Sequence, residues 1–405
     1  MSFNGKLNVL CIGGGMISEE VVLPTLFQQR RNGKIDKIAI SSLNSGILKR
    51  LQEVFPNEDF VPYPDPATTD PDAPFPDLYR QALGDLGEHG LVYVCTPDHF
   101  HTRMVLESIN AGYDVCCMKP LCLKVDEAWE IIELAKAKGA YVFTEYHKRK
   151  DRAVRALRYK FRRGELGEPL YGHAWIEEPK YMPLKVFGAW AEKSSPFEYI
   201  GTHYADVYYY VTNLLPKRVV AWGQKKFLPK HGSDAYDANQ AVVEWEDGSA
   251  FWIQTSWIRS DNNAAMTSQG MMFQGTKGEY KADHKDRHLN FEIDDKGFEQ
   301  FNPNFFKAYD SWDSEDGVEH VGYGYESNSQ PLEDVLKLKT ATDGMSPEEA
   351  VAKRQEMIAA WTELNTRALP ENALIGVAIN EAVRISVDNG SRFVEFGEGM
   401  QPRLA

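Results

Sequence analysis

The chain has 405 residues, more than one hydrophobic core usually holds, so we expect two domains. A hydrophobic content of 43% with 26% charged residues is typical of a globular protein, and the net charge of -14 disfavours a nucleic-acid partner because phosphate binding needs a basic surface. No apolar run approaches the ~20 residues of a membrane helix. Residues 1–6 lead directly into the first predicted strand and leave no room for a signal peptide, so we expect a cytoplasmic protein with no membrane partner.

Cysteine usage indicates neither a disulfide framework nor a zinc site. The cysteines are Cys11, Cys95, Cys116, Cys117 and Cys122. Their number is odd and most lie on predicted core strands, so we expect buried, reduced thiols and no metal.

A strand and a glycine turn open the chain. Residues 7–12 form a nearly continuous apolar run, typical of a strand buried on both faces, and a helical pattern follows the glycines. In a dinucleotide fingerprint Gly13 makes the tight turn, Gly15 lets the backbone approach a pyrophosphate, and the helix that follows points N–H groups at that anion. Ser18 stands where the third glycine is usual, and the pattern also fits an ordinary strand-to-helix turn. The candidate phosphate-binding residues are Gly13, Gly15, Met16 and Ile17.

The second predicted strand, residues 35–40, leaves the choice between NAD and NADP open. An acidic residue at the end of this strand usually binds the adenosine ribose, and a nearby arginine accommodates a 2′-phosphate. Here Ser42 and Asn44 follow the strand and are our candidates for hydrogen bonds to the ribose. Lys49 and Arg50, further on, are typical of a solvated helix face. We expect NAD, with NADP as the alternative, and we expect residues 61–76, rich in proline and aspartate, to be an irregular surface excursion.

An alternating series of strands and helices continues to about residue 144. Apolar strands are predicted at 91–95, 113–118 and 140–144, with helices between them. Such a series predicts a parallel sheet, and ligands on parallel sheets bind beyond the carboxyl ends of the strands.

Three strand ends of this series carry notable residues. The glycine turn follows the first strand, Thr96 and Pro97 follow a later one, and Lys119 precedes Pro120 at the end of the next. Because the carboxyl ends of parallel strands meet at one edge, we expect these residues and His101 near one bound dinucleotide.

The ordered set of segments resembles the glucose–fructose oxidoreductase / inositol dehydrogenase family, known as Gfo/Idh/MocA. The segments are the glycine turn, 96–101 (family form T-P-N-x-x-H), 118–120 (family form E-K-P), 165–169, 201–206, 275–280 and the last helix near 381–390. The resemblance spans nearly the whole chain. It implies an NAD(P)-dependent oxidoreductase of sugars, glycosides or polyols, and a homo-oligomer formed through one face of the C-terminal sheet.

The predicted fold combines two classes. Residues 1–147 are expected to form a Rossmann domain, a doubly wound parallel sheet that binds NAD(P). Residues 148–405 are expected to form an α+β domain, because long strand-period segments are separated by turn pairs, which indicates an open, mainly antiparallel sheet. The resemblance implies that helices lie on one face of this sheet and that the domain binds substrate and mediates oligomerisation. Residues 298–343 show little periodicity, so we expect a long functional loop or an arm exchanged with a partner.

Oxidising a carbinol needs a hydride acceptor, a base for the hydroxyl proton and a cation for the developing alkoxide. Lys119 at its strand end is our candidate for the cation or proton partner, since partial desolvation beside a positive ring would lower its pKa. In isolation it also fits a surface lysine before a turn proline. His203 matches the catalytic histidine of the family and is the candidate general acid/base.

Helical spacing places Tyr199, His203 and Asp206 on one stripe, where Asp206 would either orient the imidazole or cap a neighbouring element. Many family members carry an aspartate four residues before the histidine. Tyr199 occupies that position here, and a phenol can donate a hydrogen bond but cannot serve as a negative partner at neutral pH. Met118 and Asp98 are lesser departures from the family forms.

Further substrate candidates come from a strand end and from aromatic density. Tyr146 and Arg149 follow a strand that should face the cleft, and Trp190 lies in a segment dense in aromatic residues. Sugars stack on such rings, although an aromatic core would show the same pattern. The expected substrate contacts are Lys119, Tyr146, Arg149, Trp190, Tyr199 and His203.

Three functions remain open at this point. The first is a dehydrogenase that moves hydride between NAD(P) and a sugar, glycoside or polyol. The second is a redox-neutral enzyme whose tightly bound NAD is reduced only transiently, for glycoside elimination or sugar–sugar exchange. The third is a non-catalytic, nucleotide-sensing regulator, which the presence of Lys119 and His203 disfavours.

Overall fold

The computed structural model of the protein describes residues 3–312 and 314–405. The chain divides into two compact units, each described by itself below. The first unit contains Met1–Leu121, Glu127–His147 and Phe306–Glu371, and the second contains Cys122–Asp126, Lys148–Phe305 and Asn372–Ala405. The chain changes unit between His147 and Lys148, where we placed the boundary. The chain then returns to the first unit over Phe306–Glu371 and ends in the second unit.

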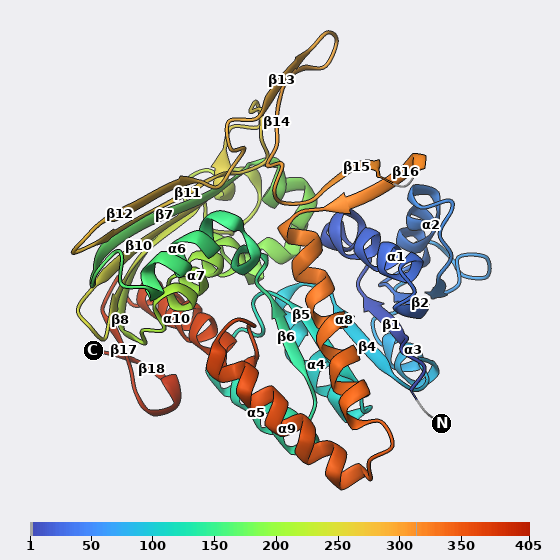
Figure 1. The fold of residues 1–405 in the computed structure, drawn as a ribbon. Coiled ribbons are helices and arrows are strands. Elements are labelled where there is room, and N and C mark those ends of the chain that lie inside the picture. The colour runs from blue at the N-terminus through green and yellow to red at the C-terminus, as the bar shows by residue number, and fades with distance from the viewer. Residues whose placement is uncertain (1–2, 313) are drawn as a thin grey trace. The chain divides into compact units, whose positions relative to one another are not determined.

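The first unit is built on a parallel six-stranded sheet of order β3-β2-β1-β4-β5-β6 (Figure 1). The strands are β1 (Leu7–Ile12), β2 (Ile35–Ser41), β3 (Val61–Tyr63), β4 (Gly90–Val94), β5 (Asp114–Met118) and β6 (Val142–Glu145). The connecting helices are α1 (Leu23–Arg31), α2 (Ser45–Val54), α3 (Tyr79–Asp85), α4 (His101–Asn110) and α5 (Val125–Lys138). This order is that of a doubly wound dinucleotide-binding sheet, so the predicted α/β architecture is confirmed.

Helices α8 (Tyr323–Thr342) and α9 (Pro347–Leu364) explain why residues 306–371 belong to the first unit. Three leucine and valine side chains of α8 join the core lined by β1, β4 and β5; they are Leu332, Val335 and Leu338. The Tyr93 hydroxyl of β4 also donates to the Asn328 carbonyl oxygen of α8 at 2.6 Å. Burial of this apolar face holds the segment on the sheet.

The expectation of a loop or exchanged arm over residues 298–343 is therefore wrong for α8. Its pattern was hard to recognise because the helix contains Pro331 and because several of its buried residues are small or polar, namely Gly324, Ser327, Asn328 and Ser329. An apolar stripe of period 3.6 is consequently interrupted.

The second unit is built on an eight-stranded sheet of order β12-β11-β7-β10-β9-β8-β17-β18. The strands are β7 (Pro169–Pro179), β8 (Pro216–Gln224), β9 (Ala238–Trp245), β10 (Ala250–Arg259), β11 (Ser268–Gly275), β12 (Glu279–Asp283), β17 (Val394–Phe396) and β18 (Pro402–Leu404). Strands β7 and β10 pair in parallel and the other pairs are antiparallel. The mainly antiparallel sheet of the prediction is confirmed.

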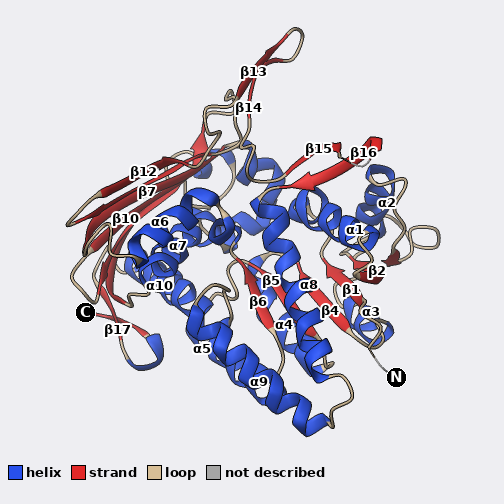
Figure 2. Cartoon of the chain, viewed as in Figure 1, coloured by secondary structure: helices blue, strands red, loops and turns tan. Residues whose placement is uncertain are grey.

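Helices α6 (Arg152–Arg162), α7 (Thr202–Thr212) and α10 (Pro370–Asp388) accompany this sheet, and α6 and α7 lie against one of its faces (Figure 2). The Tyr208 ring of α7 packs on Trp245 and Phe251, with ring centroids 4.5 and 4.7 Å apart. Along β7 the residues alternate between buried Ala174 and Ile176 and less buried neighbours, as one covered sheet face requires.

Two hairpins complete the chain. Strands β13 (Asn290–Ile293) and β14 (Gly297–Gln300) project from the second unit, and β15 (Lys307–Ser311) with β16 (Ser314–Val321) belongs to the first (Figure 1). In the second of these hairpins the His320 backbone N–H donates to Gln28 of α1 at 2.7 Å.

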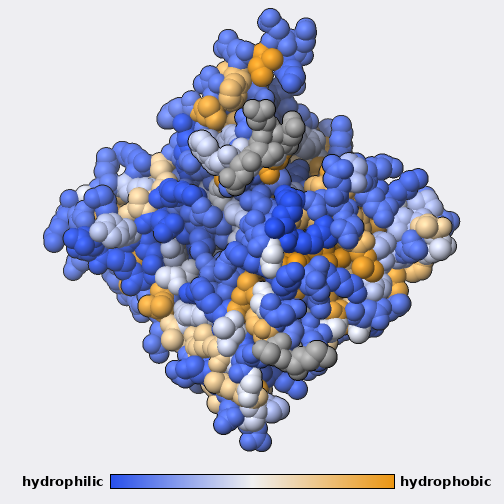
Figure 3. Space-filling view, turned by 45° about the vertical axis from the view of Figure 1, so that its right-hand side comes forward, coloured by the Kyte–Doolittle hydropathy of each residue, from blue (hydrophilic) through white to orange (hydrophobic). Residues whose placement is uncertain are grey.

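The cysteine side chains are buried, and the surface drawn in Figure 3 is mainly hydrophilic. All five cysteine side chains are buried as thiols. Among the described residues no helix is both long and apolar enough to cross a membrane. Hydrophilic side chains cover most of the face drawn in Figure 3, and apolar ones gather in limited areas.

Candidate functional site

The glycine turn follows β1 and is shaped by close backbone contacts. Gly13 has a φ of 108°, and a Cβ built there would lie 2.4 Å from the Cys95 carbonyl oxygen, so only glycine fits without displacing the backbone. Gly13 N–H donates to the Ser41 oxygen at 2.7 Å, which ties β1 to the end of β2. At Gly15, by contrast, no atom lies within 4 Å of such a Cβ. The turn therefore leaves an open approach at the position expected to face a pyrophosphate.

Ser18 has a defined task at the position of the usual third glycine. Its side chain is fully buried, and its hydroxyl donates to the Gly13 carbonyl oxygen at 2.7 Å. Met16 and Ile17 connect the turn to a π-helical segment, Ser18–Val22, that precedes α1. The serine thus closes the turn by a hydrogen bond instead of by close helix–strand packing.

The predicted ribose-binding residues lie beside this turn. A Cβ at Gly14 would be 3.4 Å from the Ser42 hydroxyl oxygen, which places Ser42 next to the glycines. The Asn44 side chain is the N-cap of α2, because its oxygen accepts the Ile47 N–H at 3.1 Å. Asn44 therefore has a structural partner that the sequence did not reveal.

His101 joins the loops at the ends of β4 and β5. Its side chain is buried, with Nδ1 2.7 Å from the Pro120 oxygen and Nε2 2.8 Å from the Thr96 oxygen. Burial lowers the pKa of His101 against the effect of these carbonyls. The imidazole thus connects the Thr96-Pro97 loop to the Lys119-Pro120 loop, whose peptide bond is cis. The predicted cofactor-side residues of the first unit are brought to one sheet edge.

A buried carboxylate at this edge was missed by the sequence analysis. Glu145 pairs with Met118 across β5 and β6 and is 2% exposed. It lies 3.2 Å from Nδ1 of His147, and the His147 ring is 5.8 Å from that of Tyr323. Tyr146, predicted to bind substrate, is almost fully buried. Both neighbours are enclosed, because this strand end is buried on both faces.

In the second unit Arg149 and Asp206 form a buried ion pair. Arg149 Nε and Nη2 donate to the two carboxylate oxygens of Asp206 at 2.8 and 2.6 Å. Burial raises the pKa of Asp206 and the guanidinium opposes that rise. Both Asp206 oxygens thus accept hydrogen bonds from Arg149, the residue that we expected to contact substrate.

Tyr199 and His203 do not share a regular α-helical stripe. A π-helical segment, Phe197–Gly201, precedes α7 and changes the rotation per residue between them. His203 is buried on α7. The i, i+4 spacing used for the prediction assumed an α-helix across this junction.

The Trp190 and Tyr199 rings lie close together. Their ring centroids are 5.3 Å apart, and each also contacts the Phe187 ring. Phe187 and Trp257 are buried beneath, whereas Trp190 and Tyr199 are only half-buried. The group therefore presents aromatic surface on a buried aromatic base.

Lys148 is a buried amine that the sequence analysis passed over as part of the domain junction. It is 1% exposed, donates to the Gln269 side-chain oxygen, and lies 5.0 Å from the centroid of the Tyr204 ring. Burial lowers its pKa to about 8. The Tyr204 hydroxyl in turn lies 3.0 Å from Nδ1 of buried His284. No sequence pattern distinguishes Lys148 from the charged residues around it.

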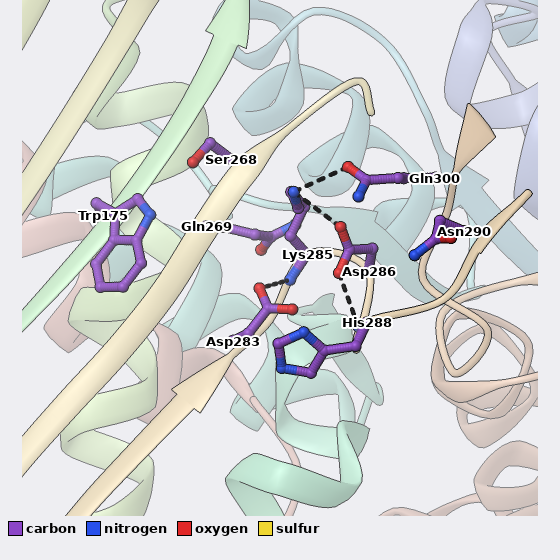
Figure 4. A pocket seen from close by; sticks show the side chains of 9 residues that line it. All are labelled: Trp175, Ser268, Gln269, Asp283, Lys285, Asp286, His288, Asn290 and Gln300. Carbon is purple, nitrogen blue, oxygen red and sulfur yellow. Dashed lines mark hydrogen bonds and ion pairs between the residues drawn. The ribbon is translucent and has the colours of Figure 1, made fainter. Parts of the chain in front are cut away.

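A pocket of about 350 Å³ lies next to this network (Figure 4). It is lined by Trp175, Ser268, Gln269, Asp283, Lys285, Asp286, His288, Asn290 and Gln300. The Trp175 indole covers Gly270, where a Cβ would be 2.4 Å from the ring. Lys285 donates to Gln300 at 3.1 Å and pairs with Asp286 at 2.8 Å. One aromatic ring among many donors and acceptors is suited to a polyhydroxylated ligand.

Two family models match the chain. Residues 7–146 match the oxidoreductase family with an NAD-binding Rossmann fold, and residues 154–281 match the GFO/IDH/MocA C-terminal domain. Together the matches cover both the glycine turn and most of the second-unit sheet.

The similar proteins include two curated proteins and one solved structure that bear on the function. The chain is 30% identical over 161 residues to 1,5-anhydro-D-fructose reductase of Ensifer adhaerens, covering 39% of this chain and 47% of that protein. It is 24% identical over 250 residues to 2,7-anhydro-N-acetylneuraminate hydratase of Mediterraneibacter gnavus, covering 58% and 60%. The chain thus spans less than two thirds of the length of either relative. An inositol dehydrogenase homolog from Azotobacter vinelandii, complexed with NADH and myo-inositol, shares the fold with a TM-score of 0.68 at 19% identity, covering 97% of this chain and 98% of that chain.

Proposed function

The chain belongs to the Gfo/Idh/MocA oxidoreductase family, and we propose that it transfers hydride between a nicotinamide dinucleotide and a carbinol carbon of a sugar, glycoside or polyol. The observation that carries the proposal is the glycine turn. Position 13 requires glycine because a Cβ there would collide with the Cys95 carbonyl oxygen, while the space at Gly15 is open to a pyrophosphate. A bound nicotinamide would supply the hydride acceptor.

Side chains of the protein accept the hydroxyl proton and stabilise the negative charge that develops on the substrate oxygen. As the carbinol carbon gives up its hydride, His203 takes the hydroxyl proton and a carbonyl group forms. The Lys119 amine stabilises the developing negative charge on the oxygen. Tyr199 donates a hydrogen bond to a substrate hydroxyl, which replaces the missing aspartate as a neutral partner.

The substrate class is supported by two features of the second unit. Trp190 and Tyr199 present half-buried rings of the kind on which sugars stack, and the pocket beside Trp175 offers carboxylate, amine and amide groups. The similar proteins that are named for an anhydrosugar and for an inositol have substrates of this polyhydroxylated kind.

A redox-neutral mode is the second candidate, and the similarity to a hydratase favours it. In that mode the sugar gives hydride to the nicotinamide, and the carbonyl group that forms activates the sugar for elimination or addition. The hydride then returns to the same molecule. Reduced nicotinamide would then not accumulate, and the cofactor would stay with the purified protein.

The test is a panel of sugars, glycosides and polyols with NAD and with NADP, followed by nicotinamide absorbance and by product analysis. We expect turnover on at least one member, and His203→Ala should lower it by roughly 10² to 10⁴. Full activity of His203→Ala would remove that residue from the mechanism. Absence of both turnover and nucleotide binding would contradict the proposed function.

A further inference from the structure

A segment that we call the acidic loop, residues 65–77, packs against the connection between β2 and α2. The loop is anchored at two places. Phe75 N–H donates to the Leu43 oxygen at 2.6 Å, and the Ser45 hydroxyl lies 3.3 and 3.2 Å from the Thr69 and Asp70 oxygens. Ser45 is almost fully buried under these contacts. The loop is therefore a fixed wall of the turn where a dinucleotide fold receives the adenosine ribose.

The first N–H groups of α2 are already used. Gly46 N–H donates to the Pro71 oxygen at 3.1 Å, and Ile47 N–H donates to the Asn44 side chain at 3.1 Å. The approach of the loop is close, because a Cβ at Gly46 would lie 2.9 Å from that same Pro71 oxygen. A phosphate on the ribose 2′-oxygen would have to displace these acceptors to reach the helix terminus.

The charges at this turn also oppose a phosphate. The acidic loop carries Asp65, Asp70, Asp72 and Asp77, and the side chains of Asp65 and Asp70 accept hydrogen bonds from the Ala67 and Asp72 N–H groups. Arg50 of α2 is the first arginine after the end of β2, and its guanidinium pairs with the Glu19 carboxylate at 2.8 Å. A dianionic group at the ribose would thus meet exposed carboxylates, while Glu19 engages the guanidinium of Arg50.

We propose that the chain selects NAD over NADP, and that the acidic loop takes the part that an acidic residue at the end of β2 plays in other dinucleotide folds. This inference rests on the proposed function only in requiring that a dinucleotide binds. The sequence left the choice between NAD and NADP open. The inference assigns that choice to contacts made by a loop that begins some twenty-five residues after β2.

The test is equilibrium binding of NADH and of NADPH to the full chain, measured by nicotinamide fluorescence at low and at high salt. We expect NADH to bind about tenfold or more tightly than NADPH, and the gap to narrow as salt screens the exposed carboxylates. Tighter or equal binding of NADPH would overturn the inference and leave the proposed function standing. Binding of neither nucleotide would overturn both.

Two variants separate the loop charges from the fold. Asp70→Asn with Asp72→Asn keeps the polar side chains and should raise NADPH affinity by about two- to threefold for each charge removed, with NADH affinity unchanged. Glu19→Gln releases Arg50 and should act in the same direction. Asp36→Asn, which removes a carboxylate at the opposite end of β2, is the control and should change neither affinity. An equal effect of the loop variants on both nucleotides would contradict the assignment.

Discussion

At the scale of single residues, Lys148 has the most unusual environment. Burial lowers its pKa from 10.5 to about 8, so between these pH values the unfolded chain binds more protons than the folded one. The free energy of unfolding should therefore rise with pH across this window, by up to about 3 kcal/mol.

Lys148→Met should remove that rise, because methionine fills the site without a proton to lose. Urea unfolding of both proteins between pH 7 and 10.5 measures the slope. Lys160→Met, on an exposed side chain of α6, is the matched control and should keep the wild-type slope. Equal slopes in wild type and Lys148→Met would show that the buried amine does not titrate in this range.

Substitutions of Gly13 and Gly15 should affect stability and NADH binding differently. Gly13→Ala forces a side chain onto the Cys95 carbonyl at a positive φ and should cost about 2 to 4 kcal/mol of stability. Gly15→Ala meets no protein atom, so stability should change by less than about 1 kcal/mol while NADH affinity falls, because the new methyl group occupies the approach to the pyrophosphate. Thermal unfolding and NADH titration of each variant distinguish the effects. A Gly15→Ala protein with normal NADH affinity would place the dinucleotide elsewhere.

At the scale of elements, the pair Arg149–Asp206 joins the start of the second unit to α7. Removing one partner of a buried ion pair costs about 3 to 5 kcal/mol, because the other charge remains buried, whereas replacing both is often nearly neutral. Arg149→Met should thus destabilise strongly, and Arg149→Met with Asp206→Leu should recover most of the loss. Denaturant unfolding of the single and double variants forms the cycle. Simple additivity would mean that the pair is not energetically coupled.

The elements also show what the sequence predicts well. Strands β1, β4 and β5 are buried on both faces, so their apolar runs and the glycine turn were recognisable from residue type alone. The π-helical segment before α7 was not, since no pattern marks the insertion that rotates Tyr199 relative to His203. Partners far apart in sequence, such as Lys148 and Gln269, were likewise invisible because the spacing carries no information about them.

In the part of the chain that the structure describes, helices α6 and α7 lie against one face of the second-unit sheet, and we propose that the opposite face mediates a homo-oligomer. Trp222 and Trp252 are 43% and 47% exposed there, an unusual cost for a monomer. Trp252→Asp should shift the protein to a smaller species in light scattering. Trp312→Asp, on the separate β15–β16 hairpin, is the control with the same chemical change and should keep the wild-type mass. A wild-type monomer at micromolar concentration would contradict this proposal.

The central claim is that hydride passes between a nicotinamide dinucleotide and a carbinol carbon. The most direct measurement is incubation of the full chain with NAD and a perdeuterated polyol or sugar that it turns over, followed by mass spectrometry of the nicotinamide. The account predicts one deuterium on the reduced ring, carried there from the carbinol carbon. Turnover that leaves the nicotinamide without deuterium would contradict it.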